Sequence, residues 1–392
     1  MNMRLPLSAE PSTTTQALLA RLLAINTVSH NSNLGLIETA RDLLAALGAS
    51  CRLSYDAGRG KANLLATLGD GRAGGLVLSA HTDTVPTDGQ AWSVEPFAAT
   101  RKDGKTFGRG SCDMKGFIAC VLGAAPALAA SNNPFHIALS YDEEVGCFGA
   151  RELIADLRDA GYAPKGCIIG EPTDMVPAIA HKGVYRWRCC VRGKAAHSSL
   201  TPSSVNAIEY AAKLISRLRS MADDMAANEV KWQGFDVPFT TASVGVIKGG
   251  IADNVVPVDC EFNFEFRNLP NRDAQALFAE LQSYAHSLTP EMRAIQADAG
   301  FRFEEICAVP SFLGKADDRI TQLAQLFSNK KNTTHVAFGT EAGLFSSAGI
   351  PSVVCGPGSI TQAHQPDEFV SDAQLIECEA FLARLVSDDY TL

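Results

Sequence analysis

The sequence predicts an α/β protein with a mostly parallel central sheet, into which a ferredoxin-like α+β domain is inserted. Continuous apolar runs alternate with helical segments in both outer parts of the chain, which is typical of a parallel sheet covered by helices. The middle part has alternating apolar runs in the order β-α-β-β-α-β. With 392 residues, 46% of them hydrophobic, the chain is long enough for two cores. We therefore expect residues 1–180 and 309–392 to form the α/β domain and residues 181–308 the inserted domain.

The α/β domain is expected to open with two amphipathic helices. Leucines recur at helical spacing in Thr13–Leu23, and apolar residues do so in Asn33–Gly48, where the final glycine suits a helix C-cap. Two further helical segments are expected at Met114–Ala130 and Ala150–Ala160. Short apolar runs predict the strands, at Ala62–Leu68, Leu76–Ser79, Ile137–Tyr141, Cys167–Gly170 and Ser352–Cys355.

The inserted domain is expected to be one sheet with two helices. Its helices are predicted at Ser204–Met221 and Arg272–His286, and the apolar stripe on the first predicts that it covers the sheet. Its strands are predicted at Val184–Val191, Phe239–Ile247, Val258–Arg267 and Phe301–Cys307.

Composition excludes several classes of partner. The net charge is −9 and the chain has no basic run, so neither nucleic acid nor an anionic membrane has electrostatic support as a partner. The N-terminal residues lack the apolar core of a signal peptide, and the longest apolar stretch, Phe117–Ala130, is too short for a membrane span. Eleven cysteines without a repeated spacing favour buried thiols in a reducing cytoplasm.

Acidic residues and histidines follow the predicted strands of the α/β domain. In such sheets, ligand-binding groups collect beyond the C-terminal ends of the strands. Clustered carboxylates repel one another, and the nearby Arg109 and Lys115 are too few to neutralise them, so a bound divalent metal is the simplest explanation. The residues that follow strands are His81, Asp83, Glu143, Glu144, Glu171 and His364, and Asp113 lies in a loop between two of these strands, just before a helix.

The types of these side chains indicate which metal they would hold. Imidazoles and carboxylates, without cysteine in a ligand spacing, suit Zn²⁺ and also Co²⁺ or Mn²⁺. A pair of ions about 3.5–4 Å apart would need a bridging carboxylate. Each residue taken alone has a simpler explanation, because Asp113 could cap a helix, Glu143 and Glu144 could be solvated, and Glu171 could belong to a turn. All of these features together favour the metal site.

Four motifs follow one another along the chain: His81-Thr82-Asp83, Gly108-Arg109-Gly110 with Asp113-Met114-Lys115-Gly116, Asp142-Glu143-Glu144 with Gly146, and Gly170-Glu171-Pro172. Their order resembles that of the co-catalytic zinc aminoacylase and carboxypeptidase superfamily, which includes glutamate carboxypeptidase, succinyl-diaminopimelate desuccinylase and acetylornithine deacetylase. The resemblance covers nearly the whole chain and implies a zinc-exopeptidase-like catalytic domain with an inserted lid domain. Its closing segment, from Gly339 to Glu368, most closely resembles the acetylornithine deacetylases.

The resemblance implies a role for each residue of the metal site. His81, Asp113 and Glu171 would bind one metal ion, and Asp113, Glu144 and His364 would bind the other, so that Asp113 bridges the two. Asp83 would orient the imidazole of His81. Glu143 would be the general base that takes a proton from the attacking water and passes it to the leaving amine.

Residues of the lid and of the closing segment are implied to contact the substrate. His197 resembles the lid histidine that stabilises an oxyanion in the partner subunit of a homodimer, and Asn254 and Arg267 resemble residues that hold a substrate carboxylate. A surface histidine and an exposed strand-end charge are the simpler alternatives. Thr340 and Glu341 are expected near the substrate, where Glu341 would pair with the δ-ammonium of ornithine, although a helix N-terminal charge is an equal alternative.

These implications predict a cytoplasmic two-metal amidohydrolase that removes acetate from N2-acetyl-L-ornithine, a step of arginine biosynthesis. The nearest alternatives are another N-acyl amino acid, such as N-succinyl-diaminopimelate, or a dipeptide. Desuccinylases carry an Arg-Arg-Gly segment where this chain has His181-Lys182-Gly183, which argues against succinyl substrates. A two-metal phosphoesterase is disfavoured by Asn254 and Arg267, and a catalytically silent binding protein is disfavoured by Glu143.

Overall fold

The computed structural model describes residues 10–70 and 74–387, and these divide into two compact units. The first unit contains the chain up to Ala180, Leu313–His335, and the chain from Thr340 onward. The second contains His181–Phe312 with the short segment Val336–Gly339. The second unit therefore extends beyond residue 308, where the sequence predicted its end, because its last strand continues to Val309.

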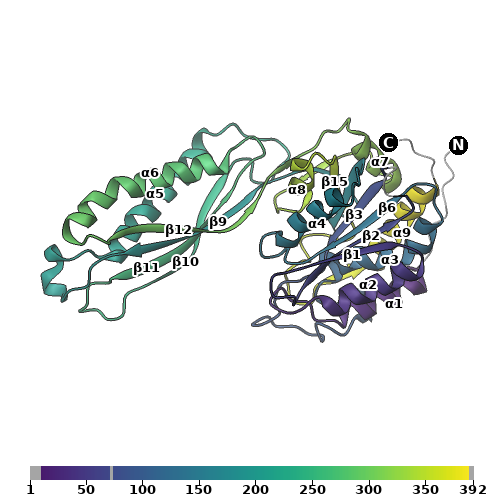
Figure 1. Ribbon diagram of the computed structural model, residues 1–392, viewed down its shortest axis with the longest axis horizontal. Helices are drawn as coiled ribbons and strands as arrows, with labels where there is room; N and C mark the ends of the chain where they lie inside the picture. The colour runs from purple at the N-terminus through teal and green to yellow at the C-terminus, as the bar shows by residue number, and fades with distance from the viewer. Residues whose placement is uncertain (1–9, 71–73, 388–392) are drawn as a thin grey trace. The chain divides into compact units, whose positions relative to one another are not determined.

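The first unit is built on a mixed sheet whose centre is parallel (Figure 1). Strands β6, β3, β7 and β15 are parallel neighbours, whereas β1, β2 and β8 join antiparallel at the two sides. The expected α/β class with a mostly parallel central sheet is thus confirmed. The order along the sheet is β1 (Ser50–Tyr55), β2 (Ala62–Leu68), β6 (Phe135–Ser140), β3 (Leu76–His81), β7 (Gly166–Pro172), β15 (Ser352–Gly356), β8 (Ala178–His181) and β13 (Phe312–Leu313), with β14 (Thr334–Val336) beside β8.

Helices cover both faces of this sheet (Figure 1). The side chain of Ser12 accepts a hydrogen bond from the Thr15 N–H and so begins the first helix at the predicted residue. One face is covered by α1 (Thr13–Leu23), α2 (Leu34–Ala46), α3 (Gly116–Ala129), α7 (Arg319–Ser328) and α9 (Asp372–Ser387), and the other by α4 (Phe148–Asp159) and α8 (Ala342–Ser347). A small separate sheet contains β4 (Thr100–Lys102), β5 (Lys105–Phe107) and β16 (Phe369–Ser371).

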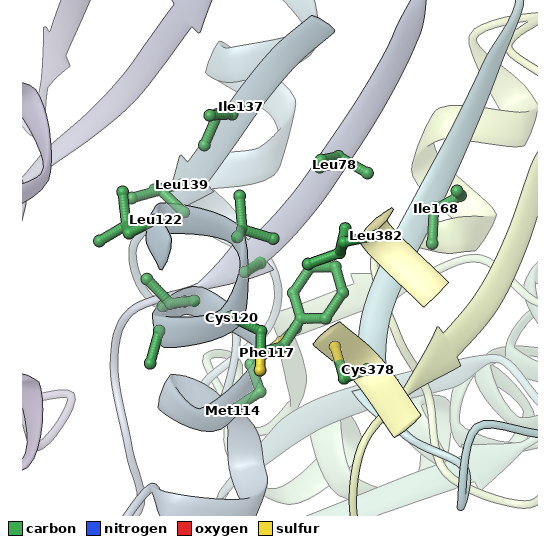
Figure 2. Packing of buried hydrophobic residues seen from close by; sticks show 14 of the residues in the cluster. Leu78, Met114, Phe117, Cys120, Leu122, Ile137, Leu139, Ile168, Cys378 and Leu382 are labelled. Carbon is green, nitrogen blue, oxygen red and sulfur yellow. The ribbon is translucent and has the colours of Figure 1, made fainter. Parts of the chain in front are cut away.

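The core of the first unit lies between the sheet and the α3–α9 layer. Phe117 of α3 is 1% exposed and packs among Leu78, Ile168 and Leu382 (Figure 2). The helical segment Ser111–Ala129 is long and apolar enough to cross a membrane, but 72% of its apolar window is buried inside the protein, as in the core helix of a globular domain. Among all eleven cysteines there is no disulfide, and only Cys51 and Cys190 are not fully buried.

The second unit has the predicted ferredoxin-like arrangement. Its antiparallel sheet runs in the order β10 (Thr241–Gly249), β11 (Asp259–Arg267), β9 (Val184–Arg192) and β12 (Gly300–Val309). Helices α5 (Ala207–Asn228) and α6 (Ala274–Ile295) lie on one face of it (Figure 1). Trp187 of β9 is buried and stacks on Phe278 of α6 with 4.3 Å between ring centroids, which fixes the helix on the sheet.

Candidate metal centre and active site

The candidate site lies where the parallel strands of the first unit end. His81 is the last residue of β3, Glu143 and Glu144 follow β6, and Glu171 lies near the end of β7. His364 follows β15, and Asp113 belongs to the short helical turn η2 (Ser111–Lys115) that precedes α3. Parallel neighbouring strands end at the same edge, so residues far apart in sequence meet there.

Two groups of side chains in this cluster have the geometry of metal ligands. In the first, the Nε2 atom of His81 lies 2.9 Å from Asp113 Oδ1 and 3.6 Å from Glu171 Oε1. In the second, His364 Nε2 lies 3.3 Å from Asp113 Oδ2 and 3.1 Å from Glu144 Oε2. Within each group, the candidate ligand atoms are all within 4.8 Å of one another. Asp113 belongs to both groups and presents a different oxygen to each.

The two groups differ in their access to solvent. His81, Asp113 and Glu171 are all buried, whereas the His364 side chain is 49% exposed. The second group therefore opens to solvent, and a substrate could approach from that side.

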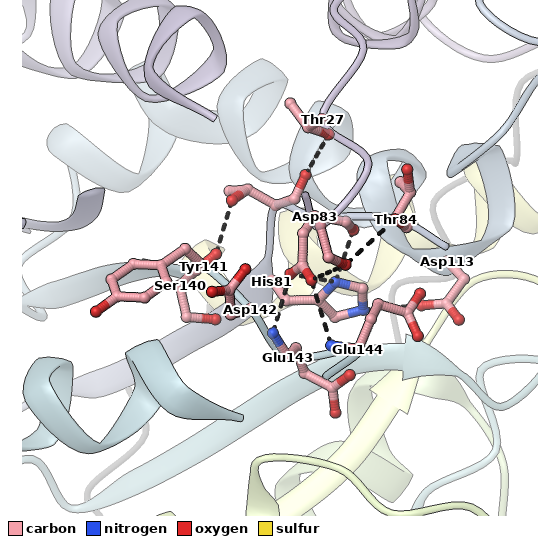
Figure 3. A network of polar contacts seen from close by, with 12 residues as sticks. Thr27, His81, Asp83, Thr84, Asp113, Ser140, Tyr141, Asp142, Glu143 and Glu144 are labelled. Atoms are coloured by element: carbon pink, nitrogen blue, oxygen red, sulfur yellow. Dashed lines mark hydrogen bonds and ion pairs between the residues drawn. The ribbon is translucent and has the colours of Figure 1, made fainter. Parts of the chain in front are cut away.

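The carboxylate of Asp83 bonds mainly to the loop of Glu143 and Glu144, and its backbone oxygen contacts His81. Its Oδ1 atom accepts a hydrogen bond of 3.0 Å from the Glu143 N–H, and its Oδ2 atom accepts bonds from the Glu144 N–H and from the Ser29 hydroxyl (Figure 3). His81 Nδ1 lies 3.0 Å from the backbone oxygen of Asp83 and 3.6 Å from its Oδ1. The backbone of Asp83 thus holds the imidazole, and its side chain positions the Glu143–Glu144 turn. Ser29 was not foreseen, because nothing in its local sequence distinguishes it from other loop serines.

The adjacent residues Glu143 and Glu144 direct their carboxylates differently. Figure 3 shows the Glu144 carboxylate beside that of Asp113, whereas the Glu143 side chain points away from this pair. The Cys147 thiol donates a hydrogen bond of 3.2 Å to Glu143 Oε1. Burial raises the pKa of Glu143 to about 8, and the charge of Glu144 adds to the effect while His81 opposes it. One of the two carboxylates can thus bind a metal while the other exchanges protons.

The electrostatics of the cluster fit bound cations. Burial, reinforced by the charge of Asp113, raises the pKa of Glu171 well above its usual range and also raises that of Glu144. Burial alone would lower the pKa of His81, but the hydrogen bond with Asp113 and the nearby carboxylate of Asp83 raise it well above its usual value, and bonds with Asp113 and Glu144 raise the pKa of His364 to about 10. The pKa values of these carboxylates and imidazoles are thus all raised, so the cluster favours bound protons at its donor atoms. Divalent cations at the same atoms would replace these protons, so the donor set fits two metal ions.

The predicted lid residues belong to the second unit. His197 is exposed, and its Nδ1 atom lies 2.8 Å from the hydroxyl of Ser199. The Ser198 N–H donates to the backbone oxygen of Asn254 at 3.0 Å, so the segments that carry His197 and Asn254 are joined. Arg267 ends β11, and its Nε atom donates to Glu265 Oε1 at 3.0 Å. His197, Asn254 and Arg267 thus lie in a different unit from the metal ligands.

Thr340 and Glu341 make internal contacts in the first unit. Glu341 is 1% exposed and accepts hydrogen bonds from the hydroxyls of Ser79, at 2.8 Å, and Ser140. The Thr340 hydroxyl accepts a bond of 3.0 Å from the Ala342 N–H at the beginning of α8. Glu341 is thus buried and bonded within the first unit, and contact of Thr340 and Glu341 with a substrate stays a prediction.

Comparison with known proteins defines the class to which this fold and site belong. The chain belongs to peptidase family M20/M25/M40, whose model matches residues 77–388. Among curated relatives, it is 37% identical over 385 residues to an acetylornithine deacetylase of Myxococcus xanthus, covering 95% of this chain and 96% of that one. It is also 34% identical over 400 residues to an acetylornithine deacetylase of Proteus mirabilis, covering 99% and 98% of the two chains.

Solved structures share the same fold. An M20 family metallo-carboxypeptidase from Sulfolobus solfataricus matches with a TM-score of 0.76 at 18% identity, covering 96% of this chain and 99% of that one. A dinuclear metal-binding M20 peptidase from Bacillus subtilis matches with a TM-score of 0.63 at 17% identity, covering 95% and 97%. The expected superfamily is therefore confirmed by family, relatives and fold together.

Proposed function

We propose that this protein is a metal-dependent amidohydrolase that removes the acetyl group from N2-acetyl-L-ornithine, releasing L-ornithine and acetate. The observation that carries the proposal is the pair of donor groups that share Asp113, with Glu143 beside them. Relatives that are named acetylornithine deacetylase and match nearly the whole chain support the choice of substrate. The protein would then serve arginine biosynthesis, and its free thiols suit the reducing cytoplasm.

The proposal assigns each donor group one divalent ion. His81, Asp113 and Glu171 would hold the first, and Asp113, Glu144 and His364 the second. Zinc suits this set of nitrogen and oxygen donors, and cobalt is an alternative that the same donors accept. When bound, such ions polarise an acyl carbonyl and make the attacking water more acidic.

Glu143 is proposed to move the proton. It takes a proton from the water as the oxygen attacks the acyl carbon, and it delivers that proton to the amine nitrogen as the C–N bond breaks. Acetate and a free amine result. The bond from the Glu143 N–H to Asp83 supports this role, because it holds the turn while the carboxylate remains directed away from Asp113.

The lid is proposed to complete the site in a homodimer. His197 would stabilise the negative charge that develops on the acyl oxygen, with the imidazole supplied to the partner's site. Asn254 and Arg267 would hold the substrate carboxylate, for which a guanidinium is well suited. The bond between the Ser198 N–H and the Asn254 oxygen supports a joint role, because it ties the two segments together.

An assay of amine release from a panel of N-acyl amino acids tests the function. With Zn²⁺ or Co²⁺ supplied, we expect the highest kcat/KM for N2-acetyl-L-ornithine among substrates that include N-acetylmethionine, N-succinyl-diaminopimelate and a dipeptide. Preference for another member would keep the chemistry and change the substrate. Metal binding without turnover of any member would contradict the enzyme and favour a binding protein.

Mixing two inactive variants tests the role of His197 across the dimer. We expect His197→Ala and Glu143→Gln proteins, each inactive alone, to recover part of the wild-type activity when mixed, since one site of each mixed dimer would contain both native groups. Subunit exchange is verified separately with differently tagged chains. Demonstrated exchange without recovery would place His197 in the site of its own subunit or outside the mechanism.

A further inference from the structure

The carboxylate of Glu368 is buried beneath the loop that carries Asp113. Glu368 is 1% exposed, and its Oε1 atom accepts hydrogen bonds from the backbone N–H groups of Cys112, at 2.9 Å, and Asp113, at 3.1 Å. Its Oε2 atom accepts from the Gly110 N–H at 3.0 Å and from Arg109 Nη1 at 2.7 Å. One side chain thus holds four donors from the loop that ends in the shared metal ligand.

Arg109 extends this contact to the loop of His364. Arg109 is fully buried, and its guanidinium donates both to Glu368 and to the side-chain oxygen of Gln90. The amide nitrogen of Gln90 in turn donates to the backbone oxygen of His364 at 3.0 Å. A continuous chain of hydrogen bonds therefore connects the loops of Asp113 and His364.

This chain of hydrogen bonds reaches two of the three proposed ligands that lie outside the sheet, and the third, Glu144, is held by Asp83. His81 and Glu171 lie in β3 and β7, where neighbouring strands fix the backbone. Asp113 lies in a turn with non-helical backbone angles, and His364 lies in a loop with a φ of 63°. Ligand geometry in such segments depends on outside support, and outer contacts of this kind commonly change metal affinity by about 10–100-fold.

We infer that Glu368 and Arg109 are positioning residues that fix Asp113 and, through Gln90, His364, and that they thereby set the affinity for the second metal ion. The inference rests on the proposed two-metal function. It predicts that the second ion, held by Asp113, Glu144 and His364, depends on this network more strongly than the first.

The first variant that tests the inference, Glu368→Gln, removes the negative charge of Glu368. A carboxylate offers acceptors on both oxygens, whereas glutamine presents an NH₂ group on one side. In Glu368→Gln, that group would face two N–H donors in either orientation, because each native oxygen accepts from two donors. The loop would have to shift, although the volume of the side chain is kept.

Titration of the metal-free protein with Zn²⁺, followed by competition with a chromophoric chelator, measures the effect. We expect Glu368→Gln to weaken binding of the second ion at least tenfold and that of the first ion less, and excess Zn²⁺ to restore part of kcat. Asp156→Asn is the matched control, because Asp156 is also a buried carboxylate paired with an arginine. Asp156 lies on helix α4, outside the ligand loops, and its Oδ1 atom is 2.7 Å from Arg52 Nε. It should lower thermal stability without changing either affinity.

Gln90→Ala tests the same inference without removing a buried charge. It cuts the link to His364, so we expect a weaker second ion and an unchanged first ion. Gln16→Ala, which removes another glutamine bonded to an arginine, Arg101, is its control. If both variants fold and each binds both Zn²⁺ ions with the wild-type affinities, the inference is wrong. If Glu368→Gln fails to fold, the affinities of Gln90→Ala alone decide. A wild-type protein that binds fewer than two ions would instead contradict the proposed function.

Discussion

Replacement of Glu143 by glutamine is expected to lower kcat by about 10²–10⁴-fold while both metal ions remain bound. Glutamine has nearly the shape of glutamate but cannot accept and return the proton. The Glu143 side chain points away from Asp113, so the ligands should keep their places. Steady-state kinetics with N2-acetyl-L-ornithine and metal content after dialysis measure the two effects.

The neighbouring residue provides the matched control for this substitution. Glu144→Gln changes the same functional group one position along the chain, but its carboxylate lies beside His364 and Asp113. We expect this variant to lose the second ion and to recover some activity when metal is added in excess. If Glu143→Gln instead lost metal and Glu144→Gln kept both ions, the two roles would be reversed.

Replacement of Asp113 by alanine is expected to remove most binding of both ions and to abolish measurable turnover. Asp113 faces His81 with one oxygen and His364 with the other, and it is the donor shared by the two groups. Its loss leaves each group with two donors. Metal content after dialysis against metal-free buffer and a zinc titration of the folded variant test this expectation.

Variants of the unshared ligands complete that experiment. Glu171→Gln removes a donor from the first group alone, and His364→Ala removes one from the second group alone. Each should weaken one ion and retain the other. If the Asp113→Ala protein still binds two ions tightly, Asp113 is not a shared ligand. The same conclusion follows if Asp113→Ala loses only one ion while either control variant loses both.

Local sequence was sufficient to predict those helices and strands in which the spacing of apolar residues and the capping residues indicate the same boundaries. Strand β2 has the predicted bounds Ala62–Leu68, and helix α1 begins after its serine cap where expected. Helix α6, in contrast, continues beyond the predicted end at His286 and through Pro290 to Ile295. Met292 is fully buried there, and this tertiary packing outweighs the local cost of proline, which no local signal could reveal.

The sequence alone determined which residues could form the site, because chemical type and position after an apolar run are local properties. It placed His81, Glu144, Glu171 and His364 beyond the ends of strands that a parallel sheet brings to one edge, and Asp113 in a loop just before a helix. Only the tertiary structure decided what surrounds them. Asp83 holds the Glu143–Glu144 turn, and Glu341 is bonded to serines of two strands. Glu368 lies beneath a loop more than 250 positions away in the sequence, with a separation of 255 residues from Asp113. Such contacts depend on the distance and direction of groups remote in the chain, which a one-dimensional pattern does not contain.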